Sequence, residues 1–252
     1  MNNIKGSFKL LIIFIFFSNY LASEYPNRIL FVGNSYLYYN DSMHNHVERL
    51  LIEHYRDDDI VTKSATIGGS KLHNHNIDHL LNHENLQLDK QVDLLIMQGG
   101  STEVTTPELR AQFSETAVKF SNKAHRLGIK TALYMTHAYL ENDKRYEPNL
   151  IEKIKKAYYE AGIRSDSLVI PVGLAYEIAY QEKPKIKLHH PDGTHPGLLG
   201  TYLGACTVFA IITNSSPEGL SYNYLNKISD EDRLFLQKIA QKAYLKNKYL
   251  FK

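Results

Sequence analysis

Apolar and polar positions alternate along this chain in two recurring patterns. Short apolar runs that end in glycine or in a polar loop predict five buried strands, over residues 28–33, 60–69, 92–100, 130–139 and 167–173. Longer stretches with apolar residues at helical spacing predict amphipathic helices over 41–57, 107–127 and 148–162, and a more continuously apolar helix over 198–213. Asp41 or Ser42 is expected to cap the first of these helices.

Strands that alternate with helices in this way predict a parallel sheet covered by helices on both faces. We therefore expect an α/β fold of the three-layer α/β/α type, with a five-stranded sheet, in a single domain over residues 24–252. In such folds functional sites form beyond the carboxyl ends of the strands. The residues that directly follow each predicted strand are accordingly the candidates for chemistry.

The first 23 residues follow a different pattern from the rest of the chain. Lys5 and Lys9 precede an unbroken apolar run over 10–17, and the small residues Ala22 and Ser23 follow it. This layout is typical of a secretory signal peptide, so we expect residues 1–23 to direct export and the protein to be secreted or periplasmic. The run is shorter than the roughly 20 residues that span a bilayer, which disfavours an uncleaved anchor and predicts no stable membrane insertion.

The amino-acid composition and charge limit the kinds of partner and site that are expected. The chain has 252 residues, of which 43% are hydrophobic and 22% charged, as is usual for a folded globular protein. Its 29 basic and 27 acidic residues nearly cancel and no long basic block occurs, so no nucleic-acid partner is expected. The single cysteine, Cys206, excludes an intrachain disulfide and a cysteine-rich zinc site.

The ends of the predicted strands supply the parts that acyl transfer needs. Ser35 follows the first strand, and Asp192 and His195 lie in a glycine- and proline-punctuated loop before the last predicted helix. A serine hydroxyl becomes a nucleophile when a histidine takes its proton, and a carboxylate orients and stabilises that histidine. Gly69 and Gln98 follow the second and third strands, where a backbone amide or a side-chain donor could stabilise an oxyanion.

Four stretches carry a family resemblance, in this order: VGNSY at 32–36, IGGSKL at 67–72, MQGGS at 97–101 and DGTHPG at 192–197. Together they resemble the sequence blocks of the SGNH (GDSL-like) hydrolase superfamily, over about residues 28–213. The resemblance implies a flavodoxin-like sheet of five parallel strands, a catalytic triad of Ser35, Asp192 and His195, and no metal or other cofactor. It also implies an oxyanion hole formed by the backbone amides of Ser35 and Gly69 and by the side chain of Gln98.

Two of the blocks depart from the family pattern. Asn34 stands where the family usually has an aspartate before the serine, but it keeps an acceptor oxygen that can brace the turn, and it could also contact substrate. The third block reads QGGST instead of carrying GND, and it is similar to the QGE variant of carbohydrate-esterase branches, which gives the donor role to Gln98. Ser101 is the alternative to Gln98 and a second candidate substrate contact, and Gly68 is the alternative to Gly69.

Histidines and tyrosines near these blocks suggest further contacts. The stretch GGSKLHNH is similar to a GG-x-x-L-x-x-H pattern of secreted relatives, which would direct His75 toward the substrate; a surface or helix-start histidine is the alternative. His75 and His79 have i,i+4 spacing, but the acidic ligands and the spacing of zinc motifs are missing, so no metal site is expected. The tyrosines beside the serine, Tyr36, Tyr38 and Tyr39, could stack on sugar rings or pack in the protein.

These observations predict an exported serine esterase that hydrolyses a small-molecule or carbohydrate ester through an acyl-enzyme. A short acyl group such as acetyl on a carbohydrate is the preferred substrate, from the QGG resemblance and the export signal. A lipase, thioesterase or lysophospholipase of the same superfamily is the alternative within enzymes. A catalytically inactive carbohydrate-binding protein with this fold is the alternative outside them.

Overall fold

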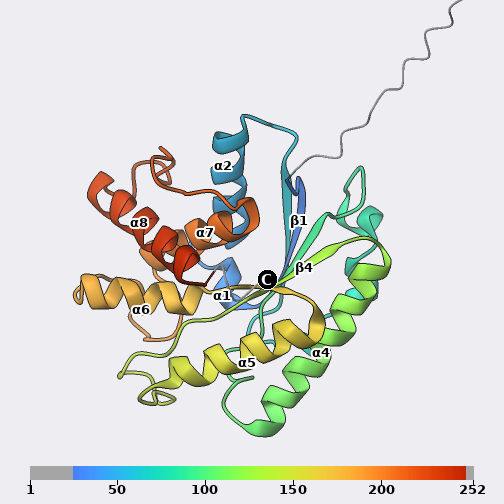
Figure 1. The fold of residues 1–252 in the computed structure, drawn as a ribbon, viewed down its shortest axis with the longest axis horizontal. Helices are drawn as coiled ribbons and strands as arrows, with labels where there is room; N and C mark the ends of the chain where they lie inside the picture. The colour runs from blue at the N-terminus through green and yellow to red at the C-terminus, as the bar shows by residue number, and fades with distance from the viewer. Residues whose placement is uncertain (1–24, 248–252) are drawn as a thin grey trace, which may run out of the picture.

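The computed structural model describes residues 25–247 and shows one parallel sheet. The sheet has five strands in the order β2-β1-β3-β4-β5, and every neighbouring pair is parallel. The strands are β1 (Arg28–Gly33), β2 (Val61–Thr66), β3 (Leu94–Met97), β4 (Lys130–Tyr134) and β5 (Leu168–Ile170). The predicted five-stranded parallel sheet is therefore confirmed (Figure 1).

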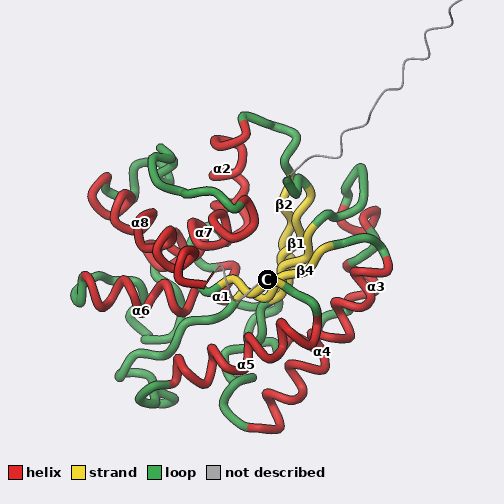
Figure 2. Tube along the Cα trace, viewed as in Figure 1, coloured by secondary structure: helices red, strands yellow, loops and turns green. Residues whose placement is uncertain are grey.

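Helices cover both faces of this sheet. They are α1 (Ser35–Tyr38), α2 (Met43–Tyr55), α3 (Ile77–Leu80), α4 (Pro107–Arg126), α5 (Leu150–Ser165), α6 (Val172–Glu182), α7 (Leu198–Thr213) and α8 (Asp230–Asn247). Two short 3₁₀ turns, η1 (Leu72–Asn74) and η2 (His83–Leu86), lie between β2 and β3. In Figure 2 helices α2, α6, α7 and α8 lie on one side of the strands, and α3, α4 and α5 lie on the other.

Two apolar clusters fill the space between the three layers. Successive side chains of a strand point to opposite faces, so Ile29 and Phe31 of β1 pack with α2, α6, α7 and α8, whereas Leu30 and Val32 pack with α4 and α5. All four of these β1 side chains are buried. A strand that is buried on both faces reads as a continuous apolar run, which is why the sequence pattern locates β1 so well.

The sequence pattern places some element ends incorrectly. The predicted strand over 167–173 ends at Ile170, because Pro171 stands at the N-cap of α6. The predicted helix over 41–57 spans 43–55, and its N-cap residue Ser42 makes no capping hydrogen bond. The Ser42 hydroxyl instead donates to the carbonyl of Leu37, at 3.1 Å. The four-residue helix α1 and the long helix α8 were not predicted.

The strand register brings the carboxyl ends of the central strands together. Val32 of β1 lies opposite Met97 of β3, and Met97 lies opposite Leu133 of β4. The loops that follow these strands therefore leave the sheet at the same edge. This is the edge at which parallel α/β sheets usually bind their ligands.

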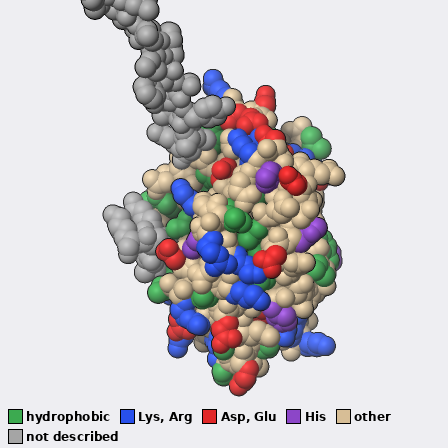
Figure 3. All heavy atoms as spheres, turned by 90° about the vertical axis from the view of Figure 1, so that its right-hand side faces the viewer, with side chains coloured by type: hydrophobic (Ala, Val, Ile, Leu, Met, Phe, Trp, Pro, Cys, Tyr) green, Lys and Arg blue, Asp and Glu red, His purple; other side chains and the backbone are tan. Residues whose placement is uncertain are grey.

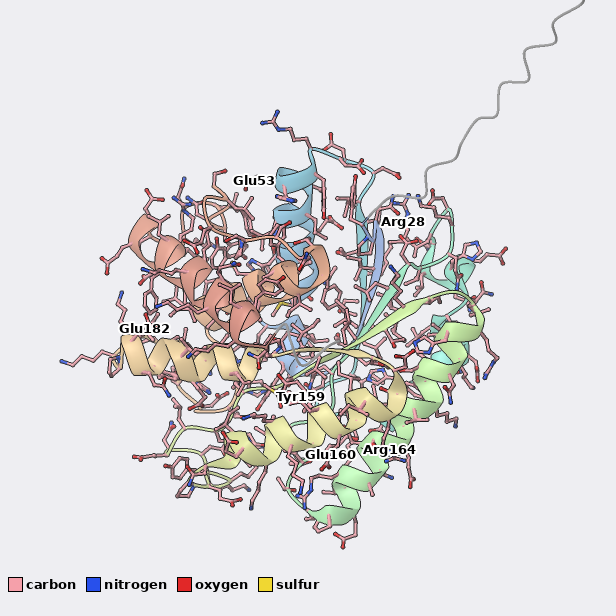
Figure 4. All side chains as sticks on the ribbon, in the orientation of Figure 1. Arg28, Glu53, Tyr159, Glu160, Arg164 and Glu182 are labelled. Atoms are coloured by element: carbon pink, nitrogen blue, oxygen red, sulfur yellow. The ribbon has the colours of Figure 1, made fainter. Side chains whose placement is uncertain are left out.

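The opposite end of β1 is anchored by a buried arginine. Arg28 forms ion pairs at 2.8 Å with Asp59, before β2, and with Asp89, before β3. Asp93 also accepts hydrogen bonds from the backbone N–H groups of Asn27 and Arg28, both at 2.9 Å. Figure 4 shows Arg28 at the end of β1 that lies away from α1.

The remaining features concern the surface charge, possible membrane-spanning helices, the single cysteine and the expected signal peptide. Figure 3 shows that both basic and acidic side chains occur on the face over α3 and α4. Within residues 25–247 no helix has the length and apolar character needed to cross a membrane. Cys206 is buried in α7. The expected signal peptide over residues 1–23 lies outside the described residues.

Candidate active site

Ser35 is presented by a sharp turn between β1 and α1. Gly33 ends the strand, and a Cβ atom at this position would lie 2.5 Å from the Gln98 Oε1, so only glycine fits. Asn34 is the N-cap of α1, and its Oδ1 accepts from the backbone N–H of Tyr36 at 3.1 Å. Ser35 is the first residue of the helix, at the carboxyl edge of the sheet.

Asn34 makes hydrogen bonds through both its backbone and its side chain. Its backbone N–H donates to the Gln98 Oε1 at 2.9 Å, and its Nδ2 donates to the carbonyl of Ser70 at 3.0 Å. Only 3% of the residue is exposed. The structure thus places Asn34 as a brace of the turn, in agreement with one of the two predicted uses, and leaves one N–H of its side-chain amide without a bond among the described residues.

Ser35, His195 and Asp192 lie in contact, although 160 positions separate the first two in sequence. The Ser35 Oγ is 2.9 Å from the His195 Nε2, and the His195 Nδ1 is 2.7 Å from the Asp192 Oδ2. This is the order of contacts in which an imidazole can take a proton from serine while a carboxylate fixes its tautomer. The His195 side chain is 24% exposed, so solvent and substrate can reach it.

Asp192 is held as an ionised carboxylate. Partial burial on its own would raise the pKa of Asp192, but the backbone N–H groups of Thr194 and His195 both donate to its Oδ1 at 3.0 Å. These bonds and the contact with the His195 ring together lower the pKa of Asp192 below its ordinary value. The His190 Nδ1 lies 3.2 Å from the Asp192 Oδ2 and gives it a second neighbour.

Thr194, which lies between Asp192 and His195 in sequence, contacts the side chains of Tyr36 and His137. The Tyr36 hydroxyl is 2.7 Å from the Thr194 Oγ1, and the His137 Nε2 is 2.7 Å from the Thr194 carbonyl oxygen. The Tyr36 and His137 rings are stacked with centroids 4.7 Å apart, and Tyr176 stacks on the other face of His137 at 4.4 Å. We call Tyr36, His137, Tyr176 and Thr194 the ring clamp.

His137 is neutral in this clamp. Burial lowers its pKa well below the ordinary value, and the neighbouring His189 adds to the effect. A neutral imidazole that donates from Nε2 to the carbonyl of Thr194 carries no proton on Nδ1, and the His137 Nδ1 has no partner within residues 25–247. Sequence reasoning missed His137, although it lies in the stretch MTHAY that directly follows the fourth strand.

Two tyrosines lie beside Ser35 and His195. The Tyr39 ring stacks on the His195 ring with centroids 4.3 Å apart and an interplanar angle of 6°. The Tyr38 ring in turn stacks against Tyr39 at 5.7 Å, and its hydroxyl lies close to Gly68. Tyr39 therefore fixes the plane of the imidazole that contacts Ser35, whereas Tyr38 is 43% exposed and faces outward.

Backbone amides for an oxyanion are present beside Ser35. Within the described part of the chain, the N–H groups of Ser35, Gly68 and Gly69 have no internal acceptor. Gly69 has a φ of +68°, which glycine adopts without strain, and the loop is closed by a hydrogen bond of 3.1 Å from the Ser70 N–H to the Ile67 carbonyl. Both glycines of this loop are exposed, so both of the predicted alternatives, Gly69 and Gly68, are available as donors.

Gln98 lies beside the nucleophile turn but is already engaged. Its Oε1 accepts from the N–H of Asn34, and its Nε2 donates to the carbonyl of Gly99. One N–H of the side-chain amide is left, and the residue is only 1% exposed. The structure thus gives Gln98 a bracing role, in addition to the donor role that the resemblance implies.

Ser101, the alternative donor, is directed toward the loop that follows β4. Its hydroxyl accepts from the Arg145 guanidinium at 3.4 Å, and its carbonyl accepts from the Tyr139 hydroxyl at 2.6 Å. These contacts tie the loop after β3 to the loop after β4. Gln98, in contrast, bonds directly to the backbone N–H of Asn34, next to Ser35.

His75 is buried rather than on the surface. Its Nε2 lies 3.2 Å from the Ser70 hydroxyl, which in turn lies 3.4 Å from the Gly33 carbonyl. Burial lowers the pKa of His75 below its ordinary value. His75 is therefore not a surface histidine; it directly precedes Asn76, the N-cap of α3, in agreement with the helix-start alternative, and it lies beside Ser70. Among residues 25–247 no three potential metal ligands converge around it or elsewhere.

Glu103 is a further buried residue that sequence reasoning missed. Its Oε2 accepts from the backbone N–H of Leu72 at 3.0 Å and from the N–H of Gly100. Burial raises the pKa of Glu103 above its ordinary value. Glu103 thereby joins the loop after β2, which carries the candidate oxyanion amides, to the loop after β3.

Comparisons with known proteins identify the fold. No protein-family model and no curated protein matches the chain. Among solved structures, a DUF4886 family protein from Bacteroides uniformis has a TM-score of 0.69 at 19% identity, and the match covers 89% of this chain and 96% of that one.

Two further structures come from named hydrolase groups. An acetyl xylan esterase has a TM-score of 0.56 at 18% identity and covers 73% of this chain and 99% of its own. A member of the lipolytic G-D-S-L family from Veillonella parvula has a TM-score of 0.54 at 12% identity and covers 75% and 99%. At the level of fold, the resemblance predicted from the four sequence blocks is confirmed: the chain has the fold of the SGNH (GDSL-like) hydrolases.

Proposed function

We propose that this protein is an esterase in which Ser35 is the nucleophile, His195 the general base and acid, and Asp192 the residue that orients His195. The observation that carries the proposal is the unbroken series of contacts from the Ser35 Oγ to the His195 Nε2, at 2.9 Å, and from the His195 Nδ1 to the Asp192 Oδ2, at 2.7 Å. The fold is shared with esterases and lipolytic enzymes, which supports the same class of reaction.

The reaction proceeds in two steps on this arrangement. His195 takes the Ser35 proton as the hydroxyl oxygen attacks the ester carbonyl, and the Asp192 carboxylate stabilises the imidazolium that forms. The N–H groups of Ser35 and Gly69, with the remaining N–H of Gln98, donate to the oxyanion. His195 then gives its proton to the leaving alcohol. In the second step His195 activates water, which releases the acid from the acyl-enzyme.

The surroundings of Ser35 bear on the acyl group. Ser35 is only 8% exposed, and Tyr39 stacks on the neighbouring His195 ring. A short acyl group such as acetyl needs no deep apolar channel beside the nucleophile, whereas a long acyl chain does. We therefore propose acetyl or a similar short acyl group, carried by a carbohydrate.

The carbohydrate part of the proposal has two supports. One of the solved structures with this fold is an acetyl xylan esterase. The pattern of residues 1–23 is typical of a secretory signal peptide, and an exported enzyme meets extracellular or periplasmic polysaccharides. We accordingly propose that the protein is secreted or periplasmic.

Steady-state hydrolysis of p-nitrophenyl acetate and of acetylated xylan tests this function. Wild-type protein should release acetate from both, and Ser35→Ala should lower kcat on both by about 10³-fold or more. Thr207→Ser is the matched control, because this buried hydroxyl in α7 only bonds to Leu203 of its own helix. Hydrolysis of long-chain but not of acetyl esters would favour a lipase, and no hydrolysis by wild type would favour an inactive binding protein.

A further inference from the structure

One of the cavities lies directly behind the loop that carries Asp192 and His195. It has a volume of about 540 Å³ and is formed by the loop after β4, by α6 and by His189. Its lining includes Tyr139, Tyr146, Tyr180, Glu141, Asn142 and Glu177. We call it the tyrosine cavity.

The tyrosine cavity and the catalytic loop share one wall. The N–H of Leu140 donates to the carbonyl of Gly193 at 2.9 Å, and the Asn142 Nδ2 donates to the carbonyl of Pro191 at 2.9 Å. The His189 Nε2 lies 2.9 Å from the Ala138 carbonyl, and its Nδ1 lies 2.7 Å from the Tyr180 hydroxyl. A ligand in the cavity would thus rest against the segment that holds the catalytic loop in place.

The chemistry of the proposed reaction points to this side of Ser35. His195 must protonate the leaving alcohol, so the alcohol part of the ester lies on the His195 side of the nucleophile. The carbonyl oxygen of the ester would face the amides of the exposed Gly68–Gly69 loop. The loop at 190–195 lies between His195 and the tyrosine cavity, so the cavity is the nearest cavity described here to the alcohol side of the ester.

The side chains that line the tyrosine cavity indicate which kind of alcohol group of the ester it binds. The lining has three tyrosines, two glutamates and an asparagine amide, and it has no lysine or arginine. The nearby Arg145 does not change this balance, because it is paired with Asp143 at 2.6 Å and lies over the Tyr139 ring at 4.2 Å. The Tyr139 and Tyr180 rings are covered by Arg145 and His189, so Tyr146 is the tyrosine of this lining with an open ring face. That face, with the carboxylate and amide groups, suits the apolar face and the hydroxyl groups of an uncharged sugar, and the two carboxylates disfavour an anionic one.

We propose that the tyrosine cavity is a subsite for an uncharged sugar unit of the substrate, separated by the catalytic loop from the unit that carries the ester. The inference rests on the proposed esterase function and adds to it a substrate class: neutral oligosaccharide esters of several units, rather than esters of single sugars or of acidic sugars. Tyr146, which is 41% exposed, offers its ring to the sugar, and its hydroxyl lies 3.5 Å from the Glu141 Oε1.

Kinetics on a long and a short substrate test the subsite. Tyr146→Ala and Glu141→Gln should each raise KM for acetylated xylohexaose by about 5–20-fold and leave kcat within about twofold, since one stacking or hydrogen-bonding contact is lost. Neither change should alter kcat/KM for p-nitrophenyl acetate, which is too small to reach the cavity. Leu225→Ala, at a residue that is 82% exposed between α7 and α8, is the matched control and should alter neither substrate.

A binding measurement separates failure of the subsite from failure of the esterase. Calorimetric titration of the Ser35→Ala protein with unacetylated xylohexaose should show binding that Tyr146→Ala weakens by a similar factor, whether or not the wild type hydrolyses esters. Binding of an oligosaccharide rich in uronic acid should be weaker than that of xylohexaose. Equal KM values for Tyr146→Ala and wild type, or no binding of xylohexaose at millimolar concentration, would overturn the subsite. Failure of wild type on p-nitrophenyl acetate would overturn the esterase alone.

Discussion

At the scale of single residues, the site depends on how Thr194 is held. Its N–H donates to Asp192, its carbonyl contacts His137, and its hydroxyl contacts Tyr36, the residue next to the nucleophile. One threonine thus links the strand end that carries Ser35 to the loop that carries Asp192 and His195. A shift in this residue would move the imidazole relative to the serine hydroxyl, and misplacement by about 1 Å can cost about 10²-fold in rate.

His137→Phe tests this role of the ring clamp. Phenylalanine keeps a ring between Tyr36 and Tyr176 but removes the contact with the Thr194 carbonyl. We expect kcat for p-nitrophenyl acetate to fall by about tenfold with KM within twofold, as for loss of a contact that matters to the geometry of the transition state. Tyr176→Phe is the matched control.

The control works because the Tyr176 hydroxyl is buried and has no partner within residues 25–247. Its removal should leave kcat unchanged and should not lower stability. If His137→Phe and Tyr176→Phe had the same kinetics as wild type, the ring clamp would have no part in positioning the triad.

The residues of the proposed triad could be named from sequence, but those of the clamp could not. Ser35, Asp192 and His195 lie within short blocks whose spacing is local, so the order of the blocks identifies them. His137 and Glu103 act through partners 57 and 31 positions away, respectively, and nothing in the neighbouring sequence indicates those contacts. The burial of His75 was not foreseen either, although its contact with Ser70 is only five positions away in sequence.

At the scale of elements, the sheet is positioned by contacts at both ends of β1. The carboxyl end carries Asn34 and Ser35, and the amino end carries Arg28, whose side chain is 2% exposed. Arg28 bonds to the carboxylates of Asp59 and Asp89 and to the carbonyls of Asn27 and Asp59. It therefore joins the segments that enter β1, β2 and β3.

Arg28→Met should destabilise the fold without altering the chemistry. The free energy of unfolding should fall by about 1–3 kcal/mol, because buried carbonyl groups lose their donors. The loss should be smaller than for a fully buried ion pair, since Asp59 and Asp89 are exposed and stay hydrated. Urea unfolding at pH 7 measures the difference, and kcat of the folded variant should equal that of wild type.

The pH dependence of this difference has a definite sign. The hydrogen bond to Arg28 lowers the pKa of Asp59 and of Asp89, so their contribution is complete above the unfolded value of about 3.9 and is lost as the pH falls through the lowered values. The difference in stability between wild type and Arg28→Met should therefore become smaller as the pH falls below about 4, whereas the part due to the carbonyl groups of Asn27 and Asp59 should remain. A constant difference from pH 7 to pH 3 would show that the two ion pairs contribute nothing to stability.

Helices and strands could be predicted from the sequence where their burial produces a clear pattern of apolar residues. The strands of the sheet read as apolar runs, and α4 has Pro107 at its start and Gly128 after its end. Helix α1 is only four residues long, too short for a periodic pattern, and its start is set by the Asn34 cap. The predicted cap at Ser42 was wrong because Asn40, Asp41 and Ser42 all have positive φ and turn the chain away from the capping geometry.

At the scale of the whole molecule, many histidines are buried in the neutral form. Burial lowers the pKa of five of them within the described residues, namely His44, His46, His75, His137 and His189. In the unfolded chain each takes up a proton as the pH falls below about 6.5, whereas in the folded chain it does not until a lower pH. Folding therefore becomes less favourable as the pH falls through this range.

We expect the free energy of unfolding to fall between pH 7.5 and pH 5.5. A fully buried histidine such as His137 contributes up to about 1.4 kcal/mol per pH unit, and the less buried ones contribute less. The raised pKa values of Glu103 and Glu177 act in the opposite direction above about 4.5 and offset part of the effect. Urea unfolding at several pH values measures the slope, which should be shallower for His137→Phe; stability that is flat from pH 7.5 to 5.5 would contradict the neutral state of these histidines.

The most direct test of the whole account is labelling by a fluorophosphonate, which reacts with a serine only when a neighbouring base activates it. After reaction at pH 7.5, the labelled peptide is identified by mass spectrometry in wild type and in His195→Ala. We predict one label, on Ser35 in wild type, and its loss or slowing by at least about 10²-fold in His195→Ala. Absence of label from Ser35, or labelling at the same rate without His195, would contradict the proposal that Ser35 is the nucleophile.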